Sequence, residues 1–203
     1  MLNQHDYERV QRFLLEGDPI VIDPRKQWAG RNIITPRAKL NHINERGLAL
    51  SFYNDEGWGK RVKNGKYKDN YFDDDLIAAS VNLIESHWSG QIQWVTNIPS
   101  TRHPVLVPNF AKSLAKALHL PYVDAIQCYN PYPEQKTRKN SRLKLQNISD
   151  AFRIQSGIPY SSVLLVDDMI VSGWSLTLAG WLLREQGVSH VFPFILAKVM
   201  GNL

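Results

Sequence analysis

The sequence predicts an α/β protein built on a parallel sheet, and two observations carry this prediction. From residue 91 to residue 197, short apolar runs of strand length alternate with segments of helical periodicity. Residues 163–166 are apolar at consecutive positions, which is typical of a strand buried on both faces of a sheet. Because strands joined through helices pair in parallel, with right-handed crossovers, their carboxyl ends should meet at one edge, where ligands bind.

Length and composition fit one α/β domain with a small N-terminal α+β extension. The chain has 203 residues, 43% of them hydrophobic, and domains of roughly 100–200 residues leave room for such an addition. We expect the extension to span residues 1–70 and the main domain residues 71–203. The formal net charge of +5 suits polyanionic partners such as pyrophosphate or nucleic acid.

Cysteine count and hydropathy indicate the compartment. A single cysteine, Cys128, excludes intrachain disulfides and thiol-cluster zinc sites, which favours a reducing environment. No apolar run approaches the ~20 residues of a membrane helix, and the polar N-terminus lacks the apolar core of a secretory signal. We therefore expect a cytoplasmic protein with no membrane association.

The extension is predicted to contain short elements separated by basic segments. Residues 6–15 have apolar side chains at helical spacing, and residues 20–22 and 48–52 are predicted strands. Residues 28–39 and 60–68 are rich in Lys and Arg. Each is interpreted either as a basic surface segment or as part of a nucleic-acid track, and for residues 28–39, with a single Trp to stack on a base, a surface loop is favoured.

The main domain should begin with a helix. The acidic run from Asp73 to Asp75 is interpreted as its start, because carboxylates near a helix N-terminus are favoured by roughly 0.3–1 kcal/mol each, and not as a metal site. The remaining predicted elements are helices over residues 76–87, 107–118, 142–152 and 176–186, and strands over residues 92–98, 122–127, 163–166 and 191–197.

The most informative motif follows residues 163–166. Two carboxylates, Asp167 and Asp168, come first, and the turn before the next helix is Ser172, Gly173, Trp174 and Ser175. Backbone N–H groups at a helix start favour an anion, whereas adjacent carboxylates suit a ribose diol or a hydrated Mg²⁺. The motif predicts a sugar-phosphate site; the alternative is that the two acids only cap a turn.

This motif resembles the signature of the type I phosphoribosyltransferases: an apolar strand, two acids and a Thr-Gly-x-Thr loop. The resemblance implies a Rossmann-like core in which Asp167 and Asp168 are catalytic, hold the ribose hydroxyls and contact Mg²⁺ through those hydroxyls or water. It also implies that residues 172–175 bind the 5-phosphate of phosphoribosyl pyrophosphate. The serines keep the hydroxyl donors of the family's threonines, whereas Trp174 departs from the small residue that is usual there.

Two further segments offer groups for the diphosphate. After the predicted strand 92–98, the resemblance implies pyrophosphate-binding roles for Ser100, Thr101 and Arg102, which would otherwise form an ordinary polar turn. A basic arm precedes the signature, and in related enzymes such an arm closes over the diphosphate. The candidates in this arm, which would otherwise be solvated surface charges, are Lys136, Arg138, Lys139 and Arg142.

The order of these segments is similar to the competence-protein F branch of that family. The resemblance is closest to the phosphoribosyltransferase-like C-terminal region of some bacterial RecQ-type DNA helicases. The residues that carry it include Gly57-Trp58-Gly59, Gly65-Lys66-Tyr67, Pro99-Ser100 and Trp174. No Gly-x-x-x-x-Gly-Lys-Ser/Thr phosphate loop occurs, so the chain is not itself the ATP-driven motor.

The resemblance implies Mg²⁺-dependent transfer of the phosphoribosyl group to a nitrogenous base, without a covalent nucleophile. No residues define the base, although Lys198 or Trp174 could contact one. The alternative is a non-catalytic module that senses nucleotides or ribose phosphates in DNA repair or uptake. A third interpretation is direct nucleic-acid binding along a track through Trp28, Arg31, Arg37, Trp58 and residues 60–68. A helicase partner and a homodimer are both compatible with the resemblance.

Overall fold

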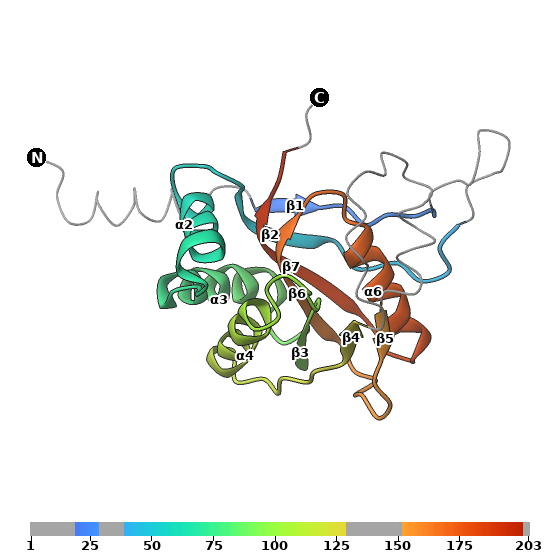
Figure 1. Cartoon of the computed structure of the whole chain (residues 1–203). Coiled ribbons are helices and arrows are strands. Elements are labelled where there is room, and N and C mark those ends of the chain that lie inside the picture. Colours follow the sequence, from blue (N-terminus) through green and yellow to red (C-terminus); the bar gives the residue numbers. More distant parts are fainter. Residues whose placement is uncertain (1–18, 29–38, 129–151, 201–203) are drawn as a thin grey trace, which may run out of the picture.

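The computed structural model describes residues 19–28, 39–128 and 152–200 as a five-stranded, mostly parallel sheet covered by helices (Figure 1). The strand order is β1-β2-β7-β6-β3, and only the pairing of β1 with β2 is antiparallel. The predicted α/β class with a parallel sheet is therefore confirmed. The strands are β1 (Ile20–Ile22), β2 (Gly47–Phe52), β3 (Trp94–Asn97), β6 (Val163–Ile170) and β7 (Val191–Lys198).

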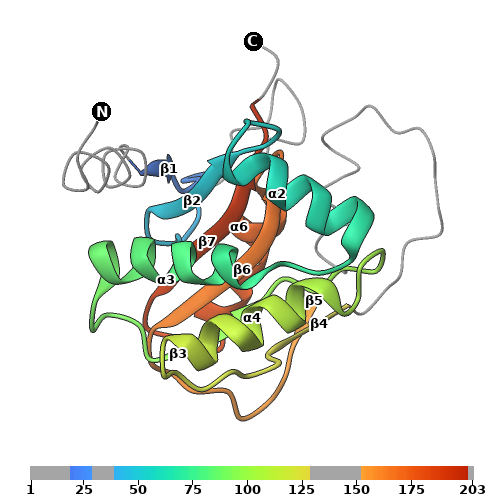
Figure 2. The ribbon, with the colours of Figure 1, turned by 90° about the vertical axis from the view of Figure 1, so that its left-hand side faces the viewer.

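Helices cover both faces of this sheet (Figure 2). On β6, Leu164 and Val166 pack into one apolar cluster together with α3 and α4, whereas Val163 and Leu165 pack into a second cluster with α6. All four side chains are fully buried, as the continuous apolar run predicts. The helices are α2 (Trp58–Asn64), α3 (Asp74–Trp88), α4 (Leu106–Ala117) and α6 (Trp174–Glu185).

The predicted helix after the acidic run is confirmed as α3, and its start has a local cause. The Asp73 carboxylate accepts a hydrogen bond from the Leu76 backbone N–H at 3.0 Å, which makes it the N-cap. Asp73 and Asp75 also pair with the Arg61 guanidinium at 3.2 and 2.8 Å. The acidic run therefore starts a helix and fixes α2 beside it.

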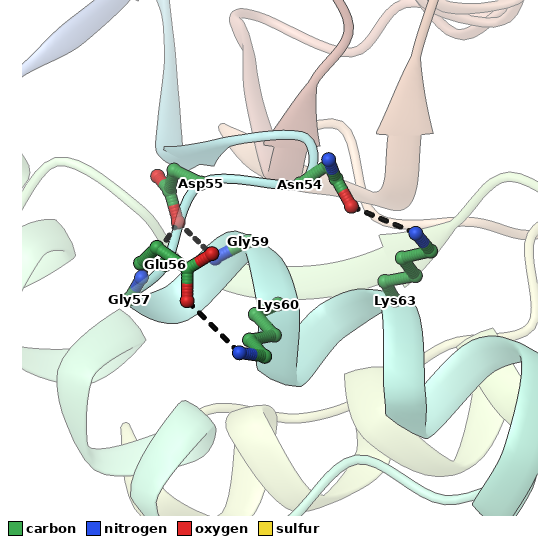
Figure 3. A network of polar contacts seen from close by, with 7 residues as sticks. All are labelled: Asn54, Asp55, Glu56, Gly57, Gly59, Lys60 and Lys63. Atoms are coloured by element: carbon green, nitrogen blue, oxygen red, sulfur yellow. Dashed lines mark hydrogen bonds and ion pairs between the residues drawn. The ribbon is translucent and has the colours of Figure 1, made fainter.

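The basic segment 60–68 is helical, which its charge did not indicate. It forms α2 and a π-helical turn, η1 (Gly65–Asp69). The Asp55 carboxylate accepts hydrogen bonds from the N–H groups of Gly57 and Gly59, at 3.2 and 2.7 Å, at the start of α2 (Figure 3). Gly59 is required there, because an added Cβ would overlap the Phe52 carbonyl oxygen. A side-chain cap therefore compensates for the weak helix propensity of the glycines.

The prediction for residues 122–127 is wrong in its pairing. Tyr122 makes only an isolated parallel bridge with Val95, and β4 (Ile126–Cys128) pairs antiparallel with β5 (Phe152–Ile154) in a separate two-stranded sheet. Phe152, predicted as the last helical residue, begins β5 because its side chain is buried in the α6-side cluster. The predicted helix 6–15 and the rest of the predicted helix 142–152 lie outside the described residues.

Strand β6 is longer than predicted, and this difference shapes the site. It continues through both acids to Ile170, because β7 pairs beside it as far as Lys198. On the other side, β3 ends at Asn97, opposite Val166. Beyond Val166, β6 has a paired neighbour on one side only, which leaves room for polar groups.

Candidate functional site

The two carboxylates of the signature lie where β6 extends beyond β3. The Asp168 side chain is 7% exposed and forms an ion pair with Lys66 Nζ, at 2.9 Å from Oδ2 and 3.0 Å from Oδ1. Lys66 comes from η1 and is itself only 16% exposed. We refer to Asp167, Asp168 and Lys66 as the carboxylate cluster. A largely buried carboxylate needs such a partner, because an unpaired charge of this kind costs several kcal/mol.

Asp167 has a different environment from its neighbour. Its Oδ1 accepts a hydrogen bond from the Asp168 backbone N–H at 2.8 Å. Burial, together with the nearby Asp168 charge, raises the pKa of the Asp167 carboxyl well above its usual range. Carboxylate oxygens accept hydrogen bonds from sugar hydroxyls and repel an anion, so the cluster suits a diol better than an anion.

Sequence reasoning missed Lys66 as a site residue. It is one of several cations in residues 60–68, and within Gly65-Lys66-Tyr67 it contributes only to the family resemblance. The π-helical turn carries it over the sheet edge, and Gly65 allows this turn, because an added Cβ would lie 2.6 Å from the Tyr71 carbonyl oxygen. Single π-helical turns are often found at functional sites, but their position is not visible in a charge pattern.

The second part of the site is the turn between β6 and α6. Gly173 has a φ of +73°, a left-handed conformation that favours glycine, and it is the N-cap of α6. No side chain caps this helix, so the first N–H groups of α6 have no side-chain acceptor. These groups are the expected anion donors of the loop.

Trp174, the residue that departs from the family's loop pattern, is 9% exposed, so the indole packs into the protein. The Arg25 guanidinium lies over the ring, with Cζ 4.1 Å from the ring centroid, and Arg25 Nη2 donates a hydrogen bond to the Ser172 carbonyl oxygen at 2.6 Å. The N-terminal extension therefore contacts the loop directly.

A cavity of about 390 Å³ lies between β1 and the start of α6. We refer to it as the loop cavity. Its lining includes Arg25, Ser172, Gly173 and Lys198, and Lys198 Nζ donates a hydrogen bond to the Val21 carbonyl oxygen at 3.1 Å. Asp167, Asp168 and Lys66 are not in the lining, so the loop cavity and the carboxylate cluster are separate regions connected by the end of β6.

The three residues predicted for pyrophosphate lie in the loop after β3. Ser100 Oγ accepts a hydrogen bond from the His103 N–H at 3.2 Å, and Thr101 and Arg102 are exposed. The His103 ring packs edge-on against Tyr67 at a centroid distance of 6.3 Å, which links this loop to η1 beside Lys66. The polar loop therefore lies near the carboxylate cluster. Lys136, Arg138, Lys139 and Arg142 lie outside the described residues.

Several residues of the predicted nucleic-acid track have partners within the described part of the chain, whereas Arg31 and Arg37 lie outside it. Lys60 pairs with Glu56 at 2.9 Å and Lys63 donates to Asn54 at 2.7 Å, as Figure 3 shows. Trp28 packs edge-on against Trp181, and Trp58 packs under Arg61. The aromatic rings needed for base stacking are therefore occupied in the described structure.

The residues described could hold Mg²⁺ only together with oxygen atoms of a bound substrate. Among residues 19–28, 39–128 and 152–200, no group of three or more His, Cys, Asp or Glu side chains could hold a metal ion. Mg²⁺ commonly needs only one or two carboxylates when substrate phosphates complete its coordination. Because Lys66 neutralises Asp168, Asp167 is the carboxyl group best placed to contribute. Over the same residues, no helix is long and apolar enough to cross a bilayer.

No protein-family model matches the sequence, and no curated protein sequence matches it. Solved structures similar to this chain include the allosteric regulatory enzyme of purine biosynthesis, with 20% identity over 59% of this chain and a TM-score of 0.42. Others are the glutamine phosphoribosylpyrophosphate amidotransferase of B. subtilis (21%, 59% of this chain, TM-score 0.40) and the adenine phosphoribosyltransferase of Saccharomyces cerevisiae (19%, 63%, TM-score 0.42).

Coverage and similarity limit what these structures say about this chain. The alignments cover 25% and 26% of the first two proteins and 70% of the third, so this chain spans about a quarter of the length of the first two. With every one of these TM-scores below 0.5, no residue role is transferred from them. Roles for this chain follow from its own geometry.

Proposed function

We propose that this protein binds phosphoribosyl pyrophosphate with Mg²⁺ and transfers its phosphoribosyl group to a nitrogenous base. One observation carries the proposal: a single strand, β6, leads from a largely neutralised carboxylate cluster into an uncapped helix start. The cluster suits the ribose diol, and the N–H groups of residues 172–175 suit the 5-phosphate. A sugar phosphate has groups in the matching order, with the uncharged diol at one end and the anionic 5-phosphate at the other.

In this proposal the side chains bind and orient the substrate and form no covalent bond with it. Asp167 and Asp168 hold the ribose hydroxyls, and the negative charge that Lys66 leaves uncompensated in the cluster stabilises the positive charge that develops at the anomeric carbon. Ser100, Thr101 and Arg102, with Lys136, Arg138 and Arg142 from the basic arm, hold the diphosphate. When bound, Mg²⁺ supplies charge neutralisation for this leaving group.

A second candidate function is a non-catalytic sensor of nucleotides or ribose phosphates, linked to DNA repair or uptake. The ion pair between Lys66 and Asp168 favours it, because a neutralised carboxylate stabilises a developing cation less than a free one does. Both candidates can bind phosphoribosyl pyrophosphate, and where they do, turnover separates them. Four further points remain predictions: a helicase or nucleic-acid partner, a homodimer, a cytoplasmic location and the domain division at residue 70.

Thermal unfolding with Mg²⁺ and phosphoribosyl pyrophosphate tests the shared claim. Ligand at about 100 times its dissociation constant should add roughly 2.7 kcal/mol, which for a protein of this size raises Tm by on the order of 5–10 °C. The variant Asp167→Asn/Asp168→Asn should lose this ligand-induced rise, whatever its own Tm is. No rise in the wild-type protein would exclude the transferase and would restrict the sensor to ligands other than phosphoribosyl pyrophosphate.

Turnover separates the two candidates. Wild-type protein that shows the ligand-induced rise is incubated with phosphoribosyl pyrophosphate, Mg²⁺ and a panel of purine and pyrimidine bases, and released pyrophosphate is measured. Release that depends on a base and disappears in the double variant supports the transferase. Binding without release for any base supports the sensor.

A further inference from the structure

We propose that Arg25 is a phosphate-binding residue, which the N-terminal extension presents to the loop between β6 and α6 by stacking it on Trp174. The inference rests on the proposed function, because the bound anion is the 5-phosphate of the sugar. It assigns the loop cavity to that phosphate and gives the N-terminal extension a direct part in selecting 5-phosphorylated ribose over ribose itself.

The first argument is the placement of the guanidinium. Arg25 is 147 residues away from Ser172 in sequence, yet its Nη2 lies 2.6 Å from the Ser172 carbonyl oxygen. An added Cβ on Gly173 would lie 4.0 Å from Arg25 Nε, so the guanidinium lies directly beside the left-handed residue at the start of α6. A cation beside the positive end of a helix dipole is unfavourable unless an anion lies between them.

The second argument is the balance of charge around the loop cavity. Of its two carboxylates, Asp23 pairs with Arg46 at 3.1 Å, and Glu45 Oε1 lies 2.8 Å from His190 Nδ1. Arg25 and Lys198 instead donate to backbone carbonyl oxygens, and in the described part of the chain neither pairs with a carboxylate. With Arg46 counted, three permanent cations surround two carboxylates, and this balance favours an anionic ligand.

The third argument explains the tryptophan in the loop. Arginine stacks on aromatic faces and still presents its N–H groups in the plane of the guanidinium, where they match phosphate oxygens. Trp174 is almost completely buried, so its ring holds the guanidinium in one position. Of the five guanidinium N–H donors, the Ser172 carbonyl uses one. Trp174 thus positions the Arg25 guanidinium, a cationic phosphate-binding group that residues 172–175 themselves lack.

Calorimetric titration with ribose 5-phosphate and with phosphoribosyl pyrophosphate plus Mg²⁺ tests the proposal. Loss of one charged contact in Arg25→Ala should weaken both ligands by roughly 10- to 100-fold. Arg25→Lys keeps the charge without the planar fork and should recover part of the loss. The matched control is Lys26→Ala, at an exposed cation next to Arg25 that does not line the loop cavity, which should bind as the wild type does.

Two readouts separate phosphate binding from a purely structural role. Ligand-free Arg25→Ala should unfold within about 2–4 °C of the wild type, because the contacts of an exposed cation contribute only about 1 kcal/mol. Trp174→Leu should weaken binding in the wild-type background and have much less effect when Arg25 is already absent. If the wild-type protein binds both ligands and Arg25→Ala binds them equally well, the Arg25 proposal is wrong and the proposed function stands. If the wild-type protein binds neither, both are overturned.

Discussion

The carboxylate cluster and the loop cavity lie along the same strand and handle charge in opposite ways. In the cluster, Asp168 is buried and already paired with Lys66. In the loop cavity, Arg25 and Lys198 donate only to main-chain oxygens. The first region is neutralised by the fold, whereas the second remains positive. Changes in the cluster should therefore act on stability as well as on ligand binding, and changes at Arg25 mainly on ligand binding.

The largest effect should come from Asp168→Asn. It leaves the Lys66 ammonium largely buried without its counter-ion, which should lower the free energy of unfolding by roughly 3 kcal/mol. Urea unfolding of both proteins at neutral pH measures it. The control is Lys66→Met/Asp168→Leu, which removes both charges and should lose less than the single variant. Equal losses in both variants would show that the ion pair does not account for the effect.

A smaller loss is expected where the extension meets α6. Asn44 Nδ2 donates to the Leu176 carbonyl oxygen at 2.9 Å, and an added Cβ at Gly180 would overlap Asn44 Oδ1. Gly180→Ala should therefore cost about 1–3 kcal/mol through overpacking, despite the better helix propensity of alanine. Gly57→Ala is the matched control, because its nearest neighbour would be 3.8 Å away. If Gly180→Ala unfolds like the wild type, the contact with Asn44 is not tight.

Asp167→Asn should shift stability in the opposite direction. Because the folded state raises the pKa of Asp167, the folded protein holds this proton more tightly than the unfolded chain. The wild-type free energy of unfolding therefore contains a term that decreases as pH rises from the ordinary carboxyl range through the raised pKa. The amide lacks this term, so the variant should gain stability relative to the wild type over that range and keep the gain above it.

Chemical denaturation across this pH range measures the Asp167 prediction. The amide oxygen can still accept the hydrogen bond from the Asp168 N–H, so the local backbone contact is retained. A stability difference that does not change with pH would contradict the assigned cause. Phosphoribosyl pyrophosphate should bind more weakly to the same variant, which would show that the cost of burying this carboxyl serves binding.

The smallest effect on stability should come from Arg46→Ala. Arg46 and Asp23 form an exposed pair, with side chains 71% and 76% exposed, and such pairs contribute at most about 1 kcal/mol. Thermal unfolding should give a Tm within about 2–4 °C of the wild type for a loss of that size. A larger drop would mean that Arg46 holds the extension in place.

Much of the core could be predicted from local patterns. The apolar run 163–166, the acids that cap α3 and the strands around residues 20–22, 48–52 and 191–197 each have a cause within a few residues of sequence. The region from 122 to 127 could not, because a three-residue strand has the same local pattern in a parallel or an antiparallel pair. Phe152–Ile154 decided it by pairing with Ile126–Cys128.

The sequence by itself determined the α/β class and the position of two carboxylates and a glycine turn along one strand. Hydrophobic period, capping and glycine conformation are local properties, so they are visible without a fold. Only the tertiary structure decided that Lys66 neutralises Asp168 and that Arg25 stacks on Trp174, because these pairs are 102 and 149 positions apart. Partners at such separations are selected by sheet order and helix packing, which no local pattern encodes.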